Sequence, residues 1–142
     1  MEIAQEKLKK EALKSGIKML ILFGSQASGK AKNESDFDLA VLMVEGKNIS
    51  KKLADYADTL FSLASIFEVT EDKIDLTNLS SASPFLQKEI FSNGKLIFGD
   101  EYEFTALKSA ALRQYIGSKS LQELRRKMIE KRQKMLAEKI YA

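Results

Sequence analysis

The fold is decided by one segment, LFGSQASGKAKNESDFDLAVL at residues 22–42. Its first apolar run ends in Gly24 and Ser25, ten residues intervene, and the pair Asp36 and Asp38 then begins a second apolar run. Short apolar runs bounded by turn residues are typical of strands that are buried on both faces of a sheet. The segment therefore predicts two core strands, the second of which begins with two carboxylates.

Further elements follow from the hydrophobic periodicity and from residues that begin or end helices. We expect a strand at residues 73–79, where Ile74 and Leu76 alternate with Asp75 and Thr77 and Asp75 lies on the polar face. The other expected elements are a helix at residues 3–14 ending at Ser15-Gly16, a helix capped by Ser50 with Leu53, Ala54, Ala57, Leu60, Phe61 and Ala64 on its apolar side, a helix from Ser83-Pro84 to Asn93-Gly94, and a strand at residues 95–98.

The segment from residue 101 onward is expected to be helical and to divide at Gly117 and Ser118 into two helices. The second of these helices carries an apolar stripe made of Leu121, Leu124, Met128, Met135, Leu136 and Ile140. A stripe at this spacing predicts packing against the body of the protein or against a partner, in preference to a ligand-binding site.

These elements predict an α/β (α+β) fold with a small sheet flanked by helices. A chain of 142 residues fits a single domain. Within that domain we expect residues 1–100 to form the core and residues 101–142 to form a C-terminal helical extension, packed on the core or on a partner. The sheet should have about three to five strands, whose order periodicity does not determine.

The composition excludes several kinds of chemistry. The chain has no Cys and no His, so disulfides, thiolate nucleophiles, imidazole bases and His-ligated zinc are excluded. Catalysis must then depend on carboxylates, hydroxyls, lysines, backbone groups or a hard metal ion such as Mg²⁺. No apolar run approaches the length of a membrane span and the first residues lack the apolar centre of a signal peptide, so we expect a soluble, cytoplasmic protein.

The net charge of +3 is concentrated at one end of the chain. Residues 118–142 hold eight Lys or Arg and three Glu, whereas the rest of the chain is slightly acidic. A basic helical segment of this kind is compatible with nucleic acid, with an acidic protein partner, or with a simple solvated face.

The residues that carry chemistry are expected to meet where the two core strands come together. A glycine after the first strand lets backbone amides approach phosphates closely, so Gly24 and Ser25 are candidates for binding a triphosphate. Asp36 and Asp38 lie two residues apart, and their side chains therefore share one face of a strand. Their mutual repulsion is relieved by Mg²⁺, and Asp75 would complete a two-metal site.

The same segment, together with KIDLTNL at residues 73–79 and LIFGD at residues 96–100, resembles the DNA polymerase β-like nucleotidyltransferase superfamily. The similarity is greatest to its small branch, the minimal nucleotidyltransferases (MNT) that include MntA-like antitoxins. It covers roughly residues 1–117 and implies a nucleotidyltransferase fold with a small mixed sheet.

The resemblance also implies roles for individual residues. Gly24 and Ser25 match the phosphate-binding pair, Asp36 and Asp38 match the metal ligands, and Asp75 matches a third metal ligand that can act as a general base. Two Mg²⁺ ions and ATP as the AMP donor are implied in the same way. Many members have arginines after the Gly-Ser pair; here Gln26 and Ser28 occupy that loop, and Lys30 is the candidate for contacting phosphate.

Members of this branch pair with a HEPN-domain toxin of the HepT type and silence it by adenylylating a tyrosine. The resemblance thus implies that this chain is the antitoxin of a type VII-like toxin–antitoxin pair. Three alternatives remain open: an antitoxin with a degenerate site that acts by binding alone, a nucleotidyltransferase for a small molecule, and one that uses RNA as the acceptor. Taken singly, a Gly-Ser pair is a common turn and an Asp-x-Asp is usually surface charge.

Overall fold

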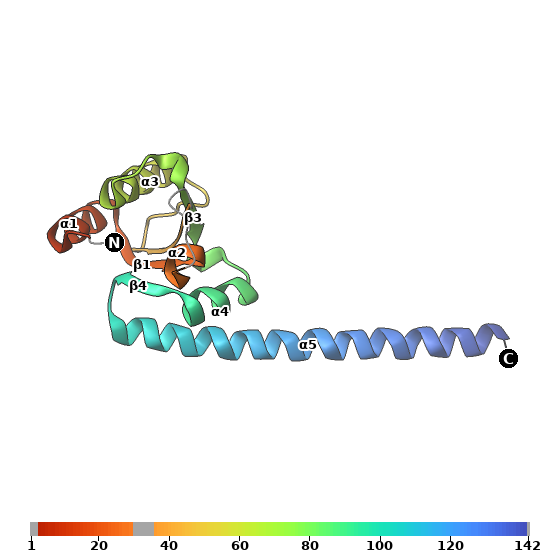
Figure 1. Ribbon diagram of the computed structural model, residues 1–142. Helices are drawn as coiled ribbons and strands as arrows, with labels where there is room; N and C mark the ends of the chain where they lie inside the picture. The colour runs from red at the N-terminus through yellow and green to blue at the C-terminus, as the bar shows by residue number, and fades with distance from the viewer. Residues whose placement is uncertain (1–2, 30–35, 142) are drawn as a thin grey trace.

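The protein is built on a four-stranded mixed sheet (Figure 1). The computed structural model describes residues 3–29 and 36–141. The strands are β1 (Ile17–Phe23), β2 (Phe37–Met43), β3 (Ile74–Asn78) and β4 (Lys95–Phe98), in the order β3-β2-β1-β4. β1 pairs antiparallel with β2 and with β4, whereas β2 and β3 are parallel. The α/β class with a small mixed sheet is therefore confirmed, and the structure supplies the strand order.

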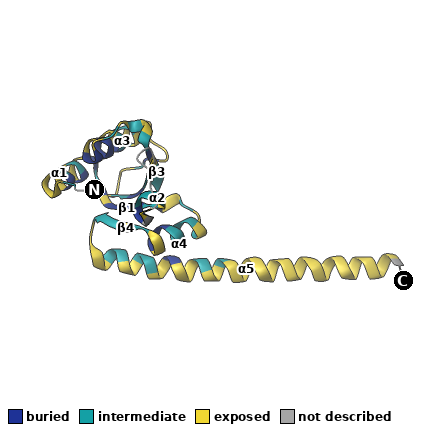
Figure 2. Ribbon diagram, in the orientation of Figure 1, coloured by how far each residue is buried: buried dark blue, intermediate teal, exposed yellow. Residues whose placement is uncertain are grey.

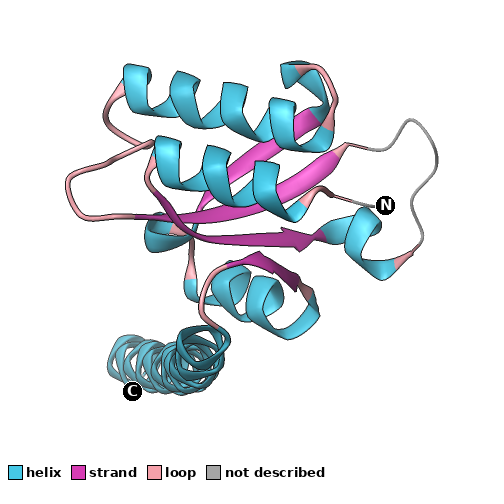
Figure 3. Cartoon of the chain, turned by 90° about the vertical axis from the view of Figure 1, so that its left-hand side faces the viewer, coloured by secondary structure: helices cyan, strands magenta, loops and turns pink. Residues whose placement is uncertain are grey.

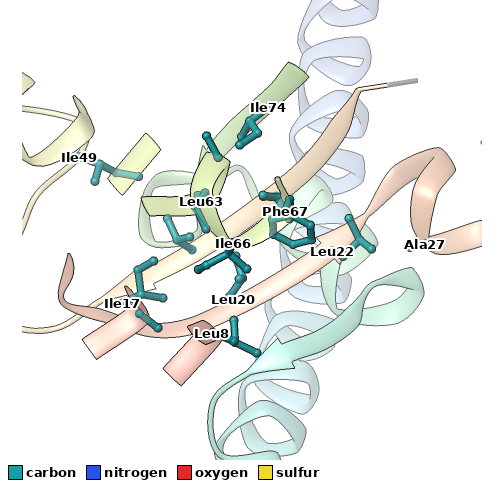
Figure 4. Packing of buried hydrophobic residues seen from close by; sticks show 14 residues of the cluster. Leu8, Ile17, Leu20, Leu22, Ala27, Ile49, Leu63, Ile66, Phe67 and Ile74 are labelled. Carbon is teal, nitrogen blue, oxygen red and sulfur yellow. The ribbon is translucent and has the colours of Figure 1, made fainter. Parts of the chain in front are cut away.

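One face of the sheet is covered by α1 (Gln5–Ser15) and α3 (Leu53–Phe67), which run along it side by side (Figure 3). The side chains of Leu20 and Leu22 on β1 lie beneath Leu63 and Phe67 of α3 in the close view of this core (Figure 4). Gly16 ends α1 in the left-handed conformation with φ of 75°, as the Ser15-Gly16 stop predicts.

The opposite face of the sheet packs on α4 (Pro84–Asn93) and on the first turns of α5 (Glu101–Tyr141). Phe91 of α4 and Phe104 of α5 stack with ring centroids 5.5 Å apart and close this second core. Ser83 caps α4 as predicted, because its hydroxyl accepts a hydrogen bond from the Leu86 N–H at 3.2 Å. Short helical segments complete the chain: α2 (Gly24–Ser28), η1 (Glu71–Lys73) and η2 (Leu79–Ser81).

The predicted start and apolar side of α3 are partly wrong. The helix begins after Lys52, and the Ser50 hydroxyl instead accepts a hydrogen bond from the Asn78 amide at 2.7 Å. Leu53 and Phe61 are 81% and 59% exposed, whereas the buried residues of the helix are Thr59, Ser62, Leu63, Ala64, Ile66 and Phe67.

Two polar residues, Thr59 and Ser62, can occupy this buried side because each has a hydrogen-bond partner. The Thr59 hydroxyl donates to the Asp55 carbonyl at 2.8 Å, and Ser62 hydrogen-bonds to Ser15 of α1. Burial of a hydroxyl costs little once it is paired in this way. A hydrophobic periodicity alone cannot show such pairing, and the predicted apolar side is therefore correct for Leu60 and Ala64 and wrong for Leu53 and Phe61.

The predicted break at Gly117 and Ser118 is also wrong, because α5 is one continuous helix of 41 residues. A glycine inside a helix costs about 1 kcal/mol relative to alanine, which is not enough to end a helix whose neighbouring residues favour it. Every described side chain of α5 beyond Ser118 is exposed, and Figure 2 shows this half in yellow, extending away from the core. Among the described residues, no helix is both long enough and apolar enough to cross a membrane.

Candidate active site

The candidate site lies where β1 ends and β2 and β3 begin. In the register of the sheet, Asp38 stands beside Phe23 of β1 on one side and beside Asp75 of β3 on the other. Directly paired residues on neighbouring strands project from the same face of the sheet. The parallel pairing of β2 with β3 thus brings together two carboxylates that are far apart in the sequence.

Phe37 fixes the face from which these carboxylates project. Its ring packs against Phe67 of α3 with centroids 5.1 Å apart, on the side of the sheet covered by α1 and α3. Since side chains alternate along a strand, Asp38 projects from the other face. The prediction that Phe37 and Asp38 point to opposite faces is confirmed, whereas Asp36 precedes β2, so that its sharing a face with Asp38 stays a prediction.

Gly24 lies directly against the Asp38 carboxylate. Its φ is 71°, in the left-handed region, and a Cβ built on it would lie 2.1 Å from Asp38 Oδ2. A side chain at this position would therefore collide with the carboxylate as well as strain the backbone. The expected turn at Gly24 and Ser25 is in fact the first turn of the five-residue helix α2, which ends at Gly29 with φ of 75°.

Asp38 is the carboxylate whose titration the site alters. Burial raises the pKa of Asp38 above its ordinary value of 3.8, and a side-chain hydrogen bond with Asp75 raises it further, as do the charges of Asp75 and Asp36. Each of these effects disfavours the ionised carboxylate. A cation bound beside Asp38 would favour the ionised carboxylate and so oppose this upward shift of the pKa, and the arrangement is therefore compatible with a metal ion.

The three predicted metal ligands are brought to one region but not into one ready-made cluster. Asp38 and Asp75 share a hydrogen bond, and Asp36 influences Asp38 through its charge. Within residues 3–29 and 36–141, no group of three or more acidic side chains is close enough together to hold an ion as it stands. Asp36 and Asp75 are both exposed, so their side chains have room to rotate. Carboxylate oxygens are the donors that Mg²⁺ prefers, and by that test the residues fit the ion.

The remaining predicted site residues are placed as follows. Ser25 is half-buried in the first turn of α2, beside Gly24. Lys30 lies outside the described residues. The sequence does not predict the contact of Gly24 with Asp38. The feature that could have indicated it is the position of Gly24 directly after the last residue of β1, the strand that pairs with β2.

A model of the polymerase beta nucleotidyltransferase family matches residues 6–103 of the chain, from α1 to the first turn of α5. The chain belongs to this nucleotidyltransferase family. The matched range contains Gly24, Ser25, Asp36, Asp38 and Asp75, and it leaves out most of α5.

One relative of this nucleotidyltransferase and two solved structures with a similar fold are informative. A protein adenylyltransferase MntA from Aphanizomenon flos-aquae (strain 2012/KM1/D3) is 36% identical over 93 residues, which is 61% of this chain and 62% of the relative's length. A crystal structure of a toxin–antitoxin with AMP-PNP superposes with a TM-score of 0.65 at 25% identity, covering 88% of this chain and 94% of that one. A tri-AMPylated Shewanella oneidensis HEPN toxin in complex with an MNT antitoxin gives a TM-score of 0.58 at 23% identity, covering 88% and 92%, and shows a shared fold.

Proposed function

We propose that this nucleotidyltransferase transfers AMP from ATP to a hydroxyl group of another protein, in a reaction that requires Mg²⁺. The observation that carries the proposal is the pairing of Asp38 with Asp75 on adjacent strands, directly beside Gly24. In nucleotidyl transfer, two neighbouring carboxylates would bind Mg²⁺, and a glycine beside them would leave room for the phosphates of ATP. The family match and the name of the Aphanizomenon relative support the same reaction.

The transfer is an in-line displacement at phosphorus. The acceptor oxygen forms a bond to the α-phosphorus of ATP while the bond from that phosphorus to the oxygen bridging to the β-phosphate breaks. Pyrophosphate leaves with the bridging oxygen, and the hydroxyl proton passes to the Asp75 carboxylate. Gly24 and Ser25 orient the β- and γ-phosphates so that the leaving group lies opposite the acceptor.

The carboxylates of Asp36, Asp38 and Asp75 would hold the Mg²⁺, as two ions if the site follows the two-metal pattern. Bound there, Mg²⁺ supplies positive charge to the attacking and leaving oxygens. Within the protein, burial and the neighbouring carboxylates raise the pKa of Asp38, so that ionisation of Asp38 is unfavourable without a metal ion. A bound cation offsets this effect, and we therefore expect the folded protein to be more stable with Mg²⁺ than without it.

The acceptor we propose is a tyrosine of a cognate HEPN-domain toxin of the HepT type. The Shewanella HEPN toxin in the related complex is tri-AMPylated, and its partner there is an MNT antitoxin. On this proposal the chain is the antitoxin of a type VII-like pair and works in the cytoplasm, where ATP is available. Transfer to the toxin, and not occupancy of its surface, would be the neutralising event.

The test is incubation of the purified chain with ATP, Mg²⁺ and the HEPN protein encoded beside it, followed by intact mass spectrometry of both proteins. We expect the HEPN protein to gain one or more AMP groups, and we expect Asp38→Asn and Asp75→Asn each to abolish the gain. Asp58→Asn is the matched control, because Asp58 is an exposed carboxylate on α3, which covers the other face of the sheet. Full transfer by Asp38→Asn would refute the proposal.

A second experiment separates transfer from neutralisation by binding. The HEPN protein is expressed in cells with the wild-type chain, with Asp38→Asn or with Asp58→Asn, and growth is measured. Rescue by the wild type and by Asp58→Asn, but not by Asp38→Asn, is expected. Rescue by all three would mean that the chain neutralises its partner by binding alone.

A further inference from the structure

The outer half of α5 is an exposed helix with a large apolar surface. Beyond Ser118 each described side chain is exposed, including Leu121, Leu124, Met128, Ile129, Met135, Leu136 and Ile140. Soluble proteins seldom leave a continuous apolar stripe of this kind uncovered unless it is an interaction surface. This part of the helix also lies outside the matched range of the family model, so the nucleotidyl-transfer site does not account for it.

A groove runs along this surface from the point where α5 leaves the core. It has a volume of about 1010 Å³. One wall is Pro84, at the start of α4, and the floor is formed by α5 itself, with Leu121, Met128 and Ile129 among its apolar residues. Gly117 also lines it, and a Cβ added there would meet no atom within 4 Å, so the helix backbone is open to close approach at this point.

The charge of the groove is of one sign. Arg125 and Arg132 both line it, and none of the other described residues along it is an Asp or a Glu. At about 100° per residue, residues seven apart on a helix fall on nearly the same side. The two arginines therefore form a row within the apolar surface, whereas Glu123 and Glu130 project from roughly the opposite side of α5 and do not line the groove.

We propose that this groove, lined by Leu121, Arg125, Met128, Ile129 and Arg132, is a docking site for an acidic amphipathic helix of another protein. Apolar side chains of the incoming helix would fill the aliphatic floor, and carboxylates along its edges would pair with the two arginines. The inference does not depend on the transfer reaction, because it rests on the surface of α5 alone.

Two other occupants fit the groove less well. If two copies of α5 packed antiparallel about a point between Arg125 and Arg132, Arg125 of one copy would face Arg132 of the other. If they packed parallel, each arginine would face the same arginine of the other copy. Both arrangements place like charges together in an apolar interface, which is unfavourable. Single-stranded nucleic acid binds to basic surfaces through stacking on aromatic side chains, and in the part of the chain that the structure describes no aromatic residue lines this groove.

The test uses the full chain and two synthetic helical peptides, each of three heptads with Leu at the core positions. One peptide carries Glu at the flanking positions and the other carries Lys there. Binding is measured by fluorescence anisotropy of the labelled peptides. We expect the Glu peptide to bind at least about tenfold more tightly than the Lys peptide.

Two double variants determine whether the groove is responsible. Arg125→Glu/Arg132→Glu should reverse the preference between the peptides. Lys127→Glu/Lys134→Glu is the matched control: it changes the net charge equally, has the same spacing on the exposed half of α5, and affects residues that do not line the groove. Arg, Lys and Glu have similar helix propensities, so both variants should keep the helix, which circular dichroism verifies.

The proposal is overturned if neither peptide binds, or if the control variant weakens the Glu peptide as much as the groove variant does. It is equally overturned if sedimentation equilibrium shows a dimer that Met128→Asp abolishes, since the occupant would then be a second copy. Tight binding of a labelled RNA that is lost in Arg125→Glu/Arg132→Glu, with no binding of the Glu peptide, would assign the groove to nucleic acid.

Discussion

Replacing Gly24 with alanine tests the geometry of the site more directly than removing a carboxylate does. The new Cβ would lie 2.1 Å from Asp38 Oδ2, whereas real Cβ contacts essentially never fall below 3.0 Å. The carboxylate must therefore withdraw by about 1 Å or rotate away. A displacement of that size in a positioning group costs on the order of a hundredfold in rate, so we expect AMP transfer by Gly24→Ala to fall about a hundredfold.

Gly29 provides a control with the same backbone and no clash. Its φ is 75° against 71° for Gly24, and a Cβ there would meet no atom of residues 3–29 or 36–141 within 4 Å. Both alanine variants place a side chain in the left-handed region, at a cost of about 1–2 kcal/mol in folding free energy. The steric conflict at Gly24 is with Asp38 Oδ2 at 2.1 Å and Cγ at 2.9 Å, which rotation of the side chain moves, and with Asp38 Cβ at 3.2 Å, which must shift by a few tenths of an ångström. Gly24→Ala should therefore be somewhat less stable than Gly29→Ala, and rates compared at equal folded fraction isolate the effect on activity.

The assay pairs urea unfolding of each variant with initial rates of AMP transfer to the HEPN protein. If Gly24→Ala and Gly29→Ala lost activity equally, the loss would be due to backbone strain in α2, and the contact between residue 24 and Asp38 would not control the rate. Wild-type activity in Gly24→Ala would refute the stated role of Gly24 altogether.

Three further predictions concern stability. Because the pKa of Asp38 is raised above 3.8 in the folded protein, the contribution of Asp38 to stability is present below pH 3.8 and is lost as the pH rises through the raised value. In thermal melts recorded in EDTA, Asp38→Asn should lack this decline; parallel pH profiles of the variant and the wild type would show that Asp38 does not cause it. Gly117→Ala should stabilise the protein by up to about 1 kcal/mol in urea unfolding, since the glycine is helical and its Cβ position is open; a loss of stability would mean that the helix is broken there. Leu20→Ala should destabilise it by about 2–5 kcal/mol, because Leu20 is fully buried beneath α3, whereas Leu121→Ala on the exposed half of α5 should change stability by less than about 0.5 kcal/mol.

The parts of the fold that the sequence predicts well are those that depend on local chemistry. The Gly16 stop, the Ser83 cap and the four strands are all where cap residues and apolar patterns indicate. The sequence also places a glycine at the end of one buried strand and acids at the start of the next, and the structure brings Gly24 and Asp38 together; the roles of these residues in catalysis stay a prediction. The family match to residues 6–103 agrees with that interpretation.

The errors arise where hydrophobic periodicity and turn residues do not register a compensating interaction or a small energy cost. Thr59 can be buried because its hydroxyl has a carbonyl acceptor one turn away, which a hydrophobicity pattern does not show. Gly117 remains inside a helix because one glycine costs only about 1 kcal/mol relative to alanine. The strand order, and with it the pairing of Asp38 with Asp75, depends on how α3 crosses from β2 to β3, which no local pattern specifies.

The parallel pairing of β2 and β3 also has a consequence for the newly made protein. Parallel strands cannot be joined by a tight turn, so the chain must complete the α3 crossover before Asp75 can reach Asp38. On the ribosome, residues emerge from the N-terminus onward, and β1, β2 and Gly24 are therefore exposed while their third strand is still being synthesised. The carboxylate pair comes into existence only when β3 docks beside β2, so it cannot form before the α3 crossover and residues 74–78 have been synthesised.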